Sequence, residues 1–277
     1  ETLEKHMDVI AADIAFLNKL DLYPVVVHGA GSELDKRLPG SKKLNGLRIT
    51  PPEDMAVIEE IFNKIGQELC EKISACGGRA MPVADVYACK PKGGYGRVGD
   101  VTGVDATEVE GATALGFTPV VSPLGKDGEL NYNINADTAA KELVKRLGPK
   151  KFILLTETGG VLDVDKKIIP YMNLGTLQDY PGITGGMLLK VNEIRDFLQE
   201  VDDCAVVITN AENLLKEMFT VKGKGTFLKY HEIVSTKDLD SVDKPKVRAL
   251  LEDAFKKELV SHYFETGIQE IIYKKDY

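Results

Sequence analysis

The sequence predicts an α/β fold, a three-layer sandwich in which helices cover both faces of a mainly parallel central sheet. Apolar, β-branched runs alternate with amphipathic helical stretches along most of the chain. Several of these runs are followed directly by turns rich in glycine or in helix-capping residues. Because open parallel sheets bind ligands at the carboxyl ends of their strands, we expect these turns to share one edge.

The N-terminal part predicts a helix–strand–loop–helix unit. Thr2–Leu20 carries apolar side chains at helical spacing and predicts an amphipathic helix. Pro24–His28 is so apolar and β-branched that we expect a strand buried on both faces. The loop Gly29–Ser32 follows at once and leads into a helix over Glu33–Leu38. This loop should therefore lie at the carboxyl end of the strand.

The next region predicts a polar, basic loop, a long helix and several short strands. Pro39–Asn45 is expected to be the loop, and Thr50 is expected to cap a helix that runs from Pro51 to near Cys76. The elements expected after it are a strand at 79–83, hairpin strands within 86–103 interrupted at 92–94, a helix at 106–115 and a buried strand at 118–122.

The stretch Tyr132–Ala140 is the centre of the predicted site. Leu130–Asn133 predicts a short strand, and Asn135 and Asp137 are favoured in the first turn of the helix that follows. A turn from strand into helix directs backbone N–H groups outward, which suits anions. A capped helix with no further role is the plainer interpretation of this stretch taken alone.

The second half of the chain continues the alternation. The expected elements are strands at 151–156 and 205–208, helices at 185–198 and 212–219, a Gly-rich turn at 158–160 before an irregular region, and a turn at 222–226 into an edge strand. His231–Val234 predicts a connecting strand, and Leu239–Leu259 predicts a separate amphipathic helix. We therefore place a domain boundary near Tyr230.

Composition limits the classes of partner. The 277 residues are 43% hydrophobic and carry a formal net charge of −8, which argues against general binding to nucleic acids or anionic membranes. No apolar run approaches the roughly 20 residues that span a bilayer. The four cysteines show no C-x-x-C spacing, so reduced thiols are expected. Uncovered apolar faces on the first helix and the tail predict a homo-oligomer.

Several motifs together resemble the acetylglutamate kinases of the amino acid kinase family. They occur in the same order as in those enzymes: His28-Gly29-Ala30-Gly31 with Leu34-Asp35, Gly46–Thr50, Asn133–Asp137, Gly185-Gly186-Met187 to Lys190, and Leu215–Thr220 with Gly223–Thr226. The likeness covers about residues 1–230, the expected kinase domain. Residues 231–277 resemble a linker and the opening of a GNAT-like acetyltransferase domain, as in bifunctional synthase/kinases.

The resemblance implies phosphoryl transfer from ATP to the side-chain carboxylate of N-acetyl-L-glutamate in arginine synthesis. Gly29, Ala30 and Gly31 would offer N–H donors to the transferring group, with Ala30 in place of a more usual glycine. Arg48 would bind the substrate α-carboxylate through a two-pronged contact, and Asn133 would help hold the substrate. The less favoured interpretation of Arg48 taken alone is a solvated loop cation.

The resemblance also assigns the nucleotide side of the site. Asp137 would orient catalytic lysines through ion pairs, and Lys190 would neutralise the ATP phosphates, on which Mg²⁺ would be carried. Thr156, Glu157, Gly159, Gly160 and Gly185 would line the nucleotide. By resemblance to arginine-sensitive relatives, we expect an L-arginine site at Glu217, Gly223 and Gly225. A glutamate exposed on a helix and followed by an ordinary turn is an equally good interpretation of those residues.

One departure and two alternatives remain open. The family's first strand carries a Lys-x-Gly-Gly segment, and since the chain begins in the following helix, we expect that strand to precede Glu1.

A non-catalytic, arginine-sensing domain of an N-acetylglutamate synthase is one alternative, and a kinase for another carboxylate or for carbamate is the other. Relatives predict a tetramer or hexamer in the bacterial cytoplasm or the mitochondrial matrix. Acetyl-CoA would bind only where a complete acetyltransferase domain follows.

Overall fold

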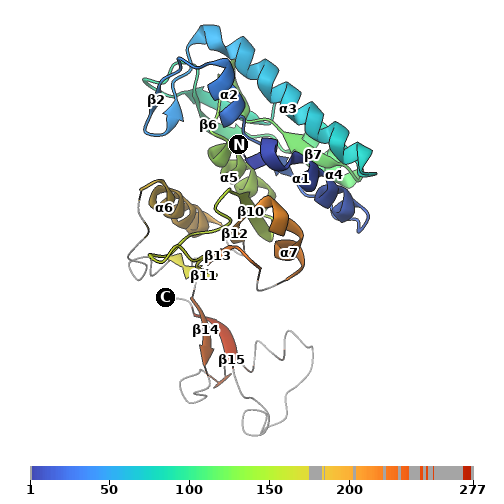
Figure 1. Cartoon of the computed structure of the whole chain (residues 1–277), viewed down its shortest axis with the longest axis vertical. Helices are drawn as coiled ribbons and strands as arrows, with labels where there is room; N and C mark the ends of the chain where they lie inside the picture. Colours follow the sequence, from blue (N-terminus) through green and yellow to red (C-terminus); the bar gives the residue numbers. More distant parts are fainter. Residues whose placement is uncertain are drawn as a thin grey trace.

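A computed structural model describes residues 2–174, 183, 185–201, 204–220, 223–229, 232–236 and 271–275, together with 244, 245, 248 and 252. Its helices and strands form the mixed α/β arrangement with parallel strand pairs that the sequence predicts (Figure 1). The helix expected at 239–259 falls outside these residues apart from four single positions. No helix of the described part has the length and apolar character needed to cross a lipid bilayer.

The first sheet is parallel and has the strand order β1-β7-β4, from Val26–Val27, Thr118–Val121 and Ala80–Val83. Helices α1 (Thr2–Asn18), α2 (Gly31–Arg37) and α3 (Met55–Ala75) lie on one face, and α4 (Thr107–Ala114) and α5 (Ala136–Leu147) lie on the other. Adjacent residues of β7 separate the two cores, since Val120 packs with α3 and Val121 packs with α5. The three-layer prediction is met here.

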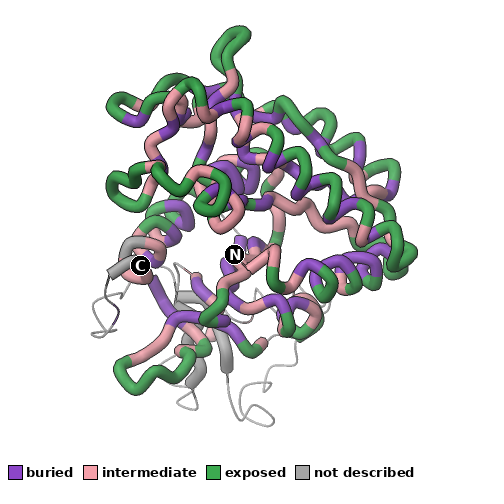
Figure 2. The backbone as a smooth tube through the Cα atoms, turned by 45° about the horizontal axis from the view of Figure 1, so that its top comes forward, coloured by how far each residue is buried: buried purple, intermediate pink, exposed green. Residues whose placement is uncertain are grey.

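Burial follows the helical period on α1 and α3. Buried side chains recur every three or four residues, at Met7, Ile10, Ile14 and Leu17 in α1, and the same spacing continues in α3 (Figure 2). The two helices pack against each other over the first sheet. The amphipathic pattern seen in the sequence therefore decides which side of each helix is buried, although Val9 and Phe16 of α1 remain exposed.

A second sheet has the order β10-β12-β13-β11, from Lys151–Leu155, Ala205–Thr209, Thr226–Lys229 and Tyr171–Asn173. Strands β10 and β12 are parallel, whereas β13 runs antiparallel to β12 and parallel to β11. The expectation of an edge strand at β13 is therefore wrong, because β13 lies between two partners. Helix α6 (Gly185–Glu200) covers this sheet, and 3₁₀ helix η3 (Ala211–Asn213) with α7 (Leu214–Phe219) follows β12.

A third sheet joins hairpins in the order β6-β5-β8-β9, from Gly99–Val104, Tyr87–Pro91, Leu124–Asp127 and Leu130–Asn133. The hairpin predicted within 86–103 is present, whereas β8 and β11 were missed. At the far end of the molecule β14 (Glu232–Thr236) pairs antiparallel with β15 (Ile271–Lys275) (Figure 1). The strand expected at 231–234 is thus present.

Three local predictions need correction. The strand expected at Pro24–His28 is only Val26–Val27, and both residues are half-buried, since among the described residues β1 pairs with β7 alone. The loop expected at Pro39–Asn45 contains a hairpin, β2 (Lys43–Leu44) with β3 (Leu47–Arg48). Thr50 caps no helix, because 3₁₀ helix η1 (Pro52–Asp54) precedes α3 and Thr50 is fully buried.

Candidate active site

The predicted substrate residues meet at one cavity of about 260 Å³. Its wall includes the loop Gly29–Gly31, residues of the β2–β3 hairpin with Arg48, and the stretch Asn133–Asp137. These segments come from the end of β1, from the hairpin before α3 and from the turn between β9 and α5. Segments more than a hundred residues apart in the sequence therefore share one hollow.

The loop after β1 leaves room for a ligand. Helix α2 begins at Gly31, so the free N–H groups of its first turn belong to this loop. A Cβ atom placed at Gly31 would meet no protein atom within 4 Å, and one at Gly29 would lie 3.5 Å from the Cβ of Ala136. Ala30 is buried and packs with α1 and α3. The loop is anchored in the core while its backbone borders open space.

His28 supports this loop from behind. The ring is buried, its Nε2 lies 3.3 Å from Ser122 Oγ, and it packs edge-on against Phe62. Burial disfavours the charged imidazolium and lowers the pKa of His28 to about 4. The residue before the glycine loop is therefore neutral at pH 7 and serves the fold rather than proton transfer.

Stability should depend on pH through His28. Its pKa of about 4 in the fold lies below the ordinary value of 6.5, so the unfolded chain takes up the proton first as pH falls. The contribution of neutral His28 to the free energy of unfolding is complete above pH 6.5, the pKa in the unfolded chain, and is lost as the pH falls toward about 4, the pKa in the fold. Between pH 7.5 and 5.0 the loss should be about 2 kcal/mol. Urea unfolding at both pH values should show this loss in the parent and in His6→Gln, and little of it in His28→Gln.

Arg48 is buried with 8% of its surface exposed, so the solvated-cation interpretation is wrong for this residue. Its guanidinium donates to a carboxylate oxygen of Asp35 and to Ser41 Oγ. Lys43 also donates to Asp35, at 2.9 Å. Hydrogen bonds from Lys43 and then from Arg48 hold the pKa of Asp35 below its usual value. Asp35 belongs to the quoted Leu34-Asp35 motif, but no role was predicted for it.

Asn133 lines the cavity and is bonded to the fully buried Thr50. The Asn133 side-chain amide donates to Thr50 Oγ1 at 3.2 Å, and its backbone N–H donates to Arg97 O at 2.9 Å. Asn135 caps α5 as predicted, since its side chain accepts from Thr138 N at 3.0 Å. This cap fixes the start of α5, so Asn133 and Asp137 have defined places at the cavity.

Asp137 connects the cavity to α6. One of its carboxylate oxygens lies 3.2 Å from Lys190 Nζ, and both side chains are partly exposed. Two further ion pairs, Lys141–Glu193 and Lys145–Glu200, join α5 to α6 beyond this point. The row of ion pairs holds the two helices in register. Lys190 is therefore brought to the start of α5 although it does not line the cavity itself.

The predicted nucleotide residues lie in the turn after β10 of the second sheet and at the start of α6. Thr156–Gly160 form the turn after β10, where Thr158 Oγ1 donates to Gly160 O at 3.0 Å and Gly159 has a φ of +71°. Glu157 pairs with Lys5 at 3.4 Å. Gly185 begins α6, the helix of Lys190. These residues follow β10 or open α6, outside the lining of the cavity, and their role in binding remains a prediction.

The predicted arginine residues form a tight structural unit. Glu217 is 4% exposed, so the interpretation as an exposed helix residue is wrong. Its Oε1 accepts from Lys224 N at 2.6 Å, from Gly225 N at 2.8 Å and from Thr209 Oγ1 at 3.2 Å. A Cβ atom at Gly223 would lie 1.6 Å from Glu217 Oε2, which only glycine avoids. The carboxylate holds the turn that leads into β13.

Glu217→Ala should lower the free energy of unfolding, whereas the same change at a surface glutamate should not. The change leaves two buried donors, the Gly225 N–H and the Thr209 hydroxyl, without their acceptor, which should cost about 3 kcal/mol. Glu212 lies exposed in η3, five residues earlier, and is the matched control. Urea unfolding should show the loss for Glu217→Ala and a change below about 0.5 kcal/mol for Glu212→Ala. Equal stability of the two variants would contradict the structural role of Glu217.

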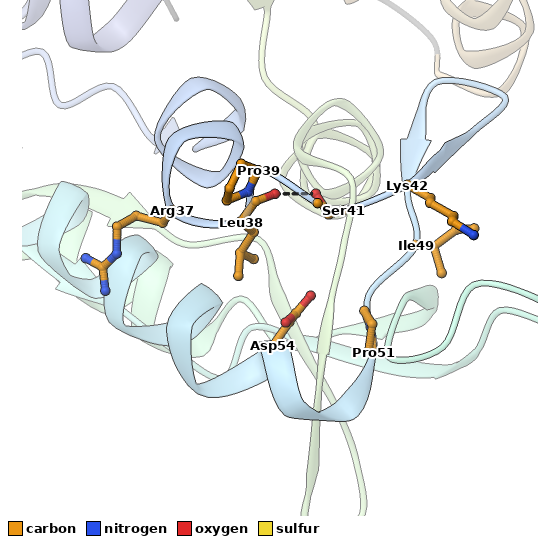
Figure 3. A pocket seen from close by; sticks show the side chains of 9 residues that line it. Arg37, Leu38, Pro39, Ser41, Lys42, Ile49, Pro51 and Asp54 are labelled. Atoms are coloured by element: carbon orange, nitrogen blue, oxygen red, sulfur yellow. Dashed lines mark hydrogen bonds between the residues drawn. The ribbon is translucent and has the colours of Figure 1, made fainter.

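A larger cavity of about 460 Å³ is lined in part by the loop that carries Ser41 (Figure 3). Its lining comes from the end of α2, the loop 38–42, Ile49 and Pro51 before η1, and Asp54 at the end of η1, with Arg37, Lys42 and Asp54 as its charged residues. Ser41 contacts both regions, since its hydroxyl donates to Leu38 O at 2.9 Å and accepts from Arg48. The smaller cavity is the candidate site, because the glycine loop, Arg48 and Asp137 gather there.

The chain is similar in sequence to known proteins. The profile of the amino acid kinase family matches residues 2–210. The chain is 36% identical to an acetylglutamate kinase of Xylella fastidiosa, over 95% of this chain and 66% of that relative. It is 31% identical to the mitochondrial bifunctional protein argC of Dictyostelium discoideum, over 90% of this chain and 31% of the relative. The chain thus spans just under two thirds of the acetylglutamate kinase.

The fold is also similar to a solved structure. The crystal structure of N-acetylglutamate synthase from Neisseria gonorrhoeae, complexed with coenzyme A and L-arginine, matches with a TM-score of 0.74. The match covers 98% of this chain and 69% of that one, at 19% identity. At this identity the likeness concerns the fold alone.

Proposed function

The chain belongs to the amino acid kinase family, and on that premise we propose that it transfers the γ-phosphoryl group of ATP to the side-chain carboxylate of N-acetyl-L-glutamate. The observation that supports this most is the cavity shared by the glycine loop, Arg48 and Asn133, with Lys190 tied to its edge through Asp137. Cations and N–H donors converge there on a space suited to an anion. Two negatively charged reactants need such a surrounding in order to meet.

The substrate would be held by side chains from the β2–β3 hairpin and from the stretch before α5. The Arg48 guanidinium would bind the α-carboxylate through paired N–H donors, since only two of its five are directed to Asp35 and Ser41. The Asn133 side chain would hold the acetylamino group, with its own orientation fixed by Thr50. The side-chain carboxylate of the substrate would then face the loop Gly29–Gly31.

In the reaction a carboxylate oxygen attacks the γ-phosphorus, and the bond to the oxygen that bridges the β- and γ-phosphorus atoms breaks. No base is needed, because the attacking carboxylate is already ionised at pH 7. N–H groups of the Gly29–Gly31 loop would stabilise the charge on the transferring group, and Lys190 would stabilise the charge that develops on ADP. Asp137 keeps the Lys190 ammonium in place.

Mg²⁺ fits the site as an ion carried on the nucleotide phosphates, where it would neutralise their charge. Within the described ranges, no three His, Cys, Asp or Glu side chains gather as a metal site. The carboxylate of Asp137 at the cavity is already paired with Lys190. The protein side of the site thus supplies cations and amides to the phosphates.

The remaining proposals concern the complete protein. L-arginine would inhibit by binding near the Glu217 turn. Acyl phosphate formation measured with and without added L-arginine tests this. A homo-oligomer, a tetramer or a hexamer, is proposed, as is the start of an acetyltransferase domain at 231–277. The bacterial cytoplasm and the mitochondrial matrix are both compatible compartments, and the argC relative is named as mitochondrial. A purely arginine-sensing domain is the weaker alternative, because it would have no need of the Asp137–Lys190 pair.

Trapping of the acyl phosphate with hydroxylamine tests the proposed reaction. The full-length protein with ATP and Mg²⁺ should form a hydroxamate from N-acetyl-L-glutamate, and far less from L-glutamate, L-aspartate or carbamate. Preference for one of these three would replace the substrate assignment. A protein that binds N-acetyl-L-glutamate and L-arginine but forms no acyl phosphate would support the sensing domain instead.

A further inference from the structure

One carboxylate of helix α2 bonds to both strands of the β2–β3 hairpin. Lys43 on β2 and Arg48 on β3 are direct partners in the hairpin ladder. Both reach Asp35 of α2, Lys43 through one carboxylate oxygen at 2.9 Å and Arg48 through the other. Two cations directly opposite each other on a ladder repel. The Asp35 carboxylate offsets that repulsion and gives both side chains a common anchor.

Burial makes the Arg48 contact the more important of the two. The Arg48 side chain is 7% exposed, whereas Lys43 and Asp35 are about half exposed, at 48% and 51%. A buried guanidinium without a counter-charge is costly, so without Asp35 it would turn toward solvent. Ser41 Oγ holds a second edge of the guanidinium but carries no charge. Asp35 is therefore the group that keeps Arg48 beside the cavity.

We propose that Asp35 is a positioning residue of the substrate site, which presents the Arg48 guanidinium to the ligand carboxylate by docking the β2–β3 hairpin on α2. The role rests on the proposed function, since the ligand is taken to be an N-acylated amino acid carboxylate. Asp35 itself touches neither reactant. It acts on the affinity for the carboxylate substrate and leaves the nucleotide side and the transfer step unchanged.

Asp35→Asn should therefore raise KM for N-acetyl-L-glutamate about tenfold to thirtyfold, the value of one charge-assisted hydrogen bond. The kcat and the KM for ATP should stay within about threefold, because Asp137 and Lys190 are unaffected. Asp35→Glu, which keeps the charge, should restore part of the affinity. Asp8 forms an exposed ion pair with Lys72 at 2.6 Å between α1 and α3, and Asp8→Asn is the matched control with parental kinetics.

A double-mutant cycle decides between positioning and a general effect on folding. In the Arg48→Met background, Asp35→Asn should raise KM little further, because both residues act on the single contact between the guanidinium and the substrate carboxylate. If the effects of Asp35→Asn and Arg48→Met on KM were fully additive, the proposal would be overturned. An unchanged KM in Asp35→Asn, or a fall in its kcat as large as the rise in its KM, would overturn it as well. Thermal unfolding of each variant separates loss of fold from loss of affinity. A parent that neither turns over nor binds N-acetyl-L-glutamate in calorimetry refutes the proposed function, and this role with it.

Discussion

Lys190→Met is expected to lower kcat for acyl phosphate formation by about 10²- to 10³-fold, the usual loss when one charge-stabilising group is removed from a reaction centre. Lys190 lies in the second turn of α6, and its Nζ is 3.2 Å from a carboxylate oxygen of Asp137 at the edge of the cavity. Its ammonium would stabilise charge that grows only as the phosphoryl group moves, so KM for N-acetyl-L-glutamate should change little.

Lys141→Met is the matched control for this prediction. Lys141 lies on α5, one turn after Asp137, and pairs with Glu193 of α6 at 2.9 Å. It therefore shares the interface between the helices but lies outside the predicted reaction centre. Hydroxamate formation at saturating ATP should remain near the parental rate for Lys141→Met. A similar small effect for both lysines would remove Lys190 from the mechanism.

Arg48→Lys is expected to raise KM for N-acetyl-L-glutamate about 30- to 100-fold while kcat falls much less. Lysine keeps the charge but loses the planar pair of donors that matches a carboxylate. It also cannot reach Asp35 and Ser41 together in the way that the guanidinium does. The change should therefore weaken both substrate binding and the anchoring of the hairpin.

The comparison for Arg48 is Arg37→Lys. Arg37 ends α2 and makes an exposed pair with Glu60 at 3.4 Å, on the side of the larger cavity. Initial rates over a range of N-acetyl-L-glutamate concentrations should give a parental KM for this variant. If Arg48→Lys also bound the substrate with parental KM, the α-carboxylate would have to lie elsewhere.

Most elements of the fold could be predicted because their burial follows a simple period. The helices α1 and α3 and the fully buried strands β7 and β12 agree with the predicted ranges within a few residues. Strand β8 was missed, since Leu124–Asp127 has no β-branched residue and depends on its pairing with β5 and β9. Strand order is set by such long-range pairing, which explains why β13 was placed at an edge.

The β2–β3 hairpin did have a local signal that was not used. Asn45 and Gly46 both have positive φ, at 49° and 79°, and Asn-Gly is the preferred pair for the tightest hairpin turns. The basic residues around it favoured a solvated loop instead. Thr50 was misplaced for a related reason: its residue type suits a cap, but its backbone bonds to Tyr95 and Arg97 in the neighbouring sheet region.

The sequence could predict which site residues meet where those residues lie in the turns that follow strands. The glycine loop after β1 and the cap before α5 reach the same cavity, although β9 belongs to the antiparallel β8–β9 pair of the third sheet and not to the parallel first sheet. The partners of Arg48 could not be read from the sequence, because Asp35 and Ser41 contact it only after the hairpin folds onto α2. Burial of Glu217 likewise depends on a turn seven residues later.

A crystal structure of the protein with N-acetyl-L-glutamate and a non-hydrolysable ATP analogue tests the shared site most directly. We expect the substrate α-carboxylate on Arg48, its side-chain carboxylate beside the Gly29–Gly31 loop, and the terminal phosphate between that loop and Lys190. The two ligands should point toward each other across the start of α5. Ligands bound at separate surfaces, with Arg48 and Lys190 contacting neither, would contradict phosphoryl transfer at this cavity.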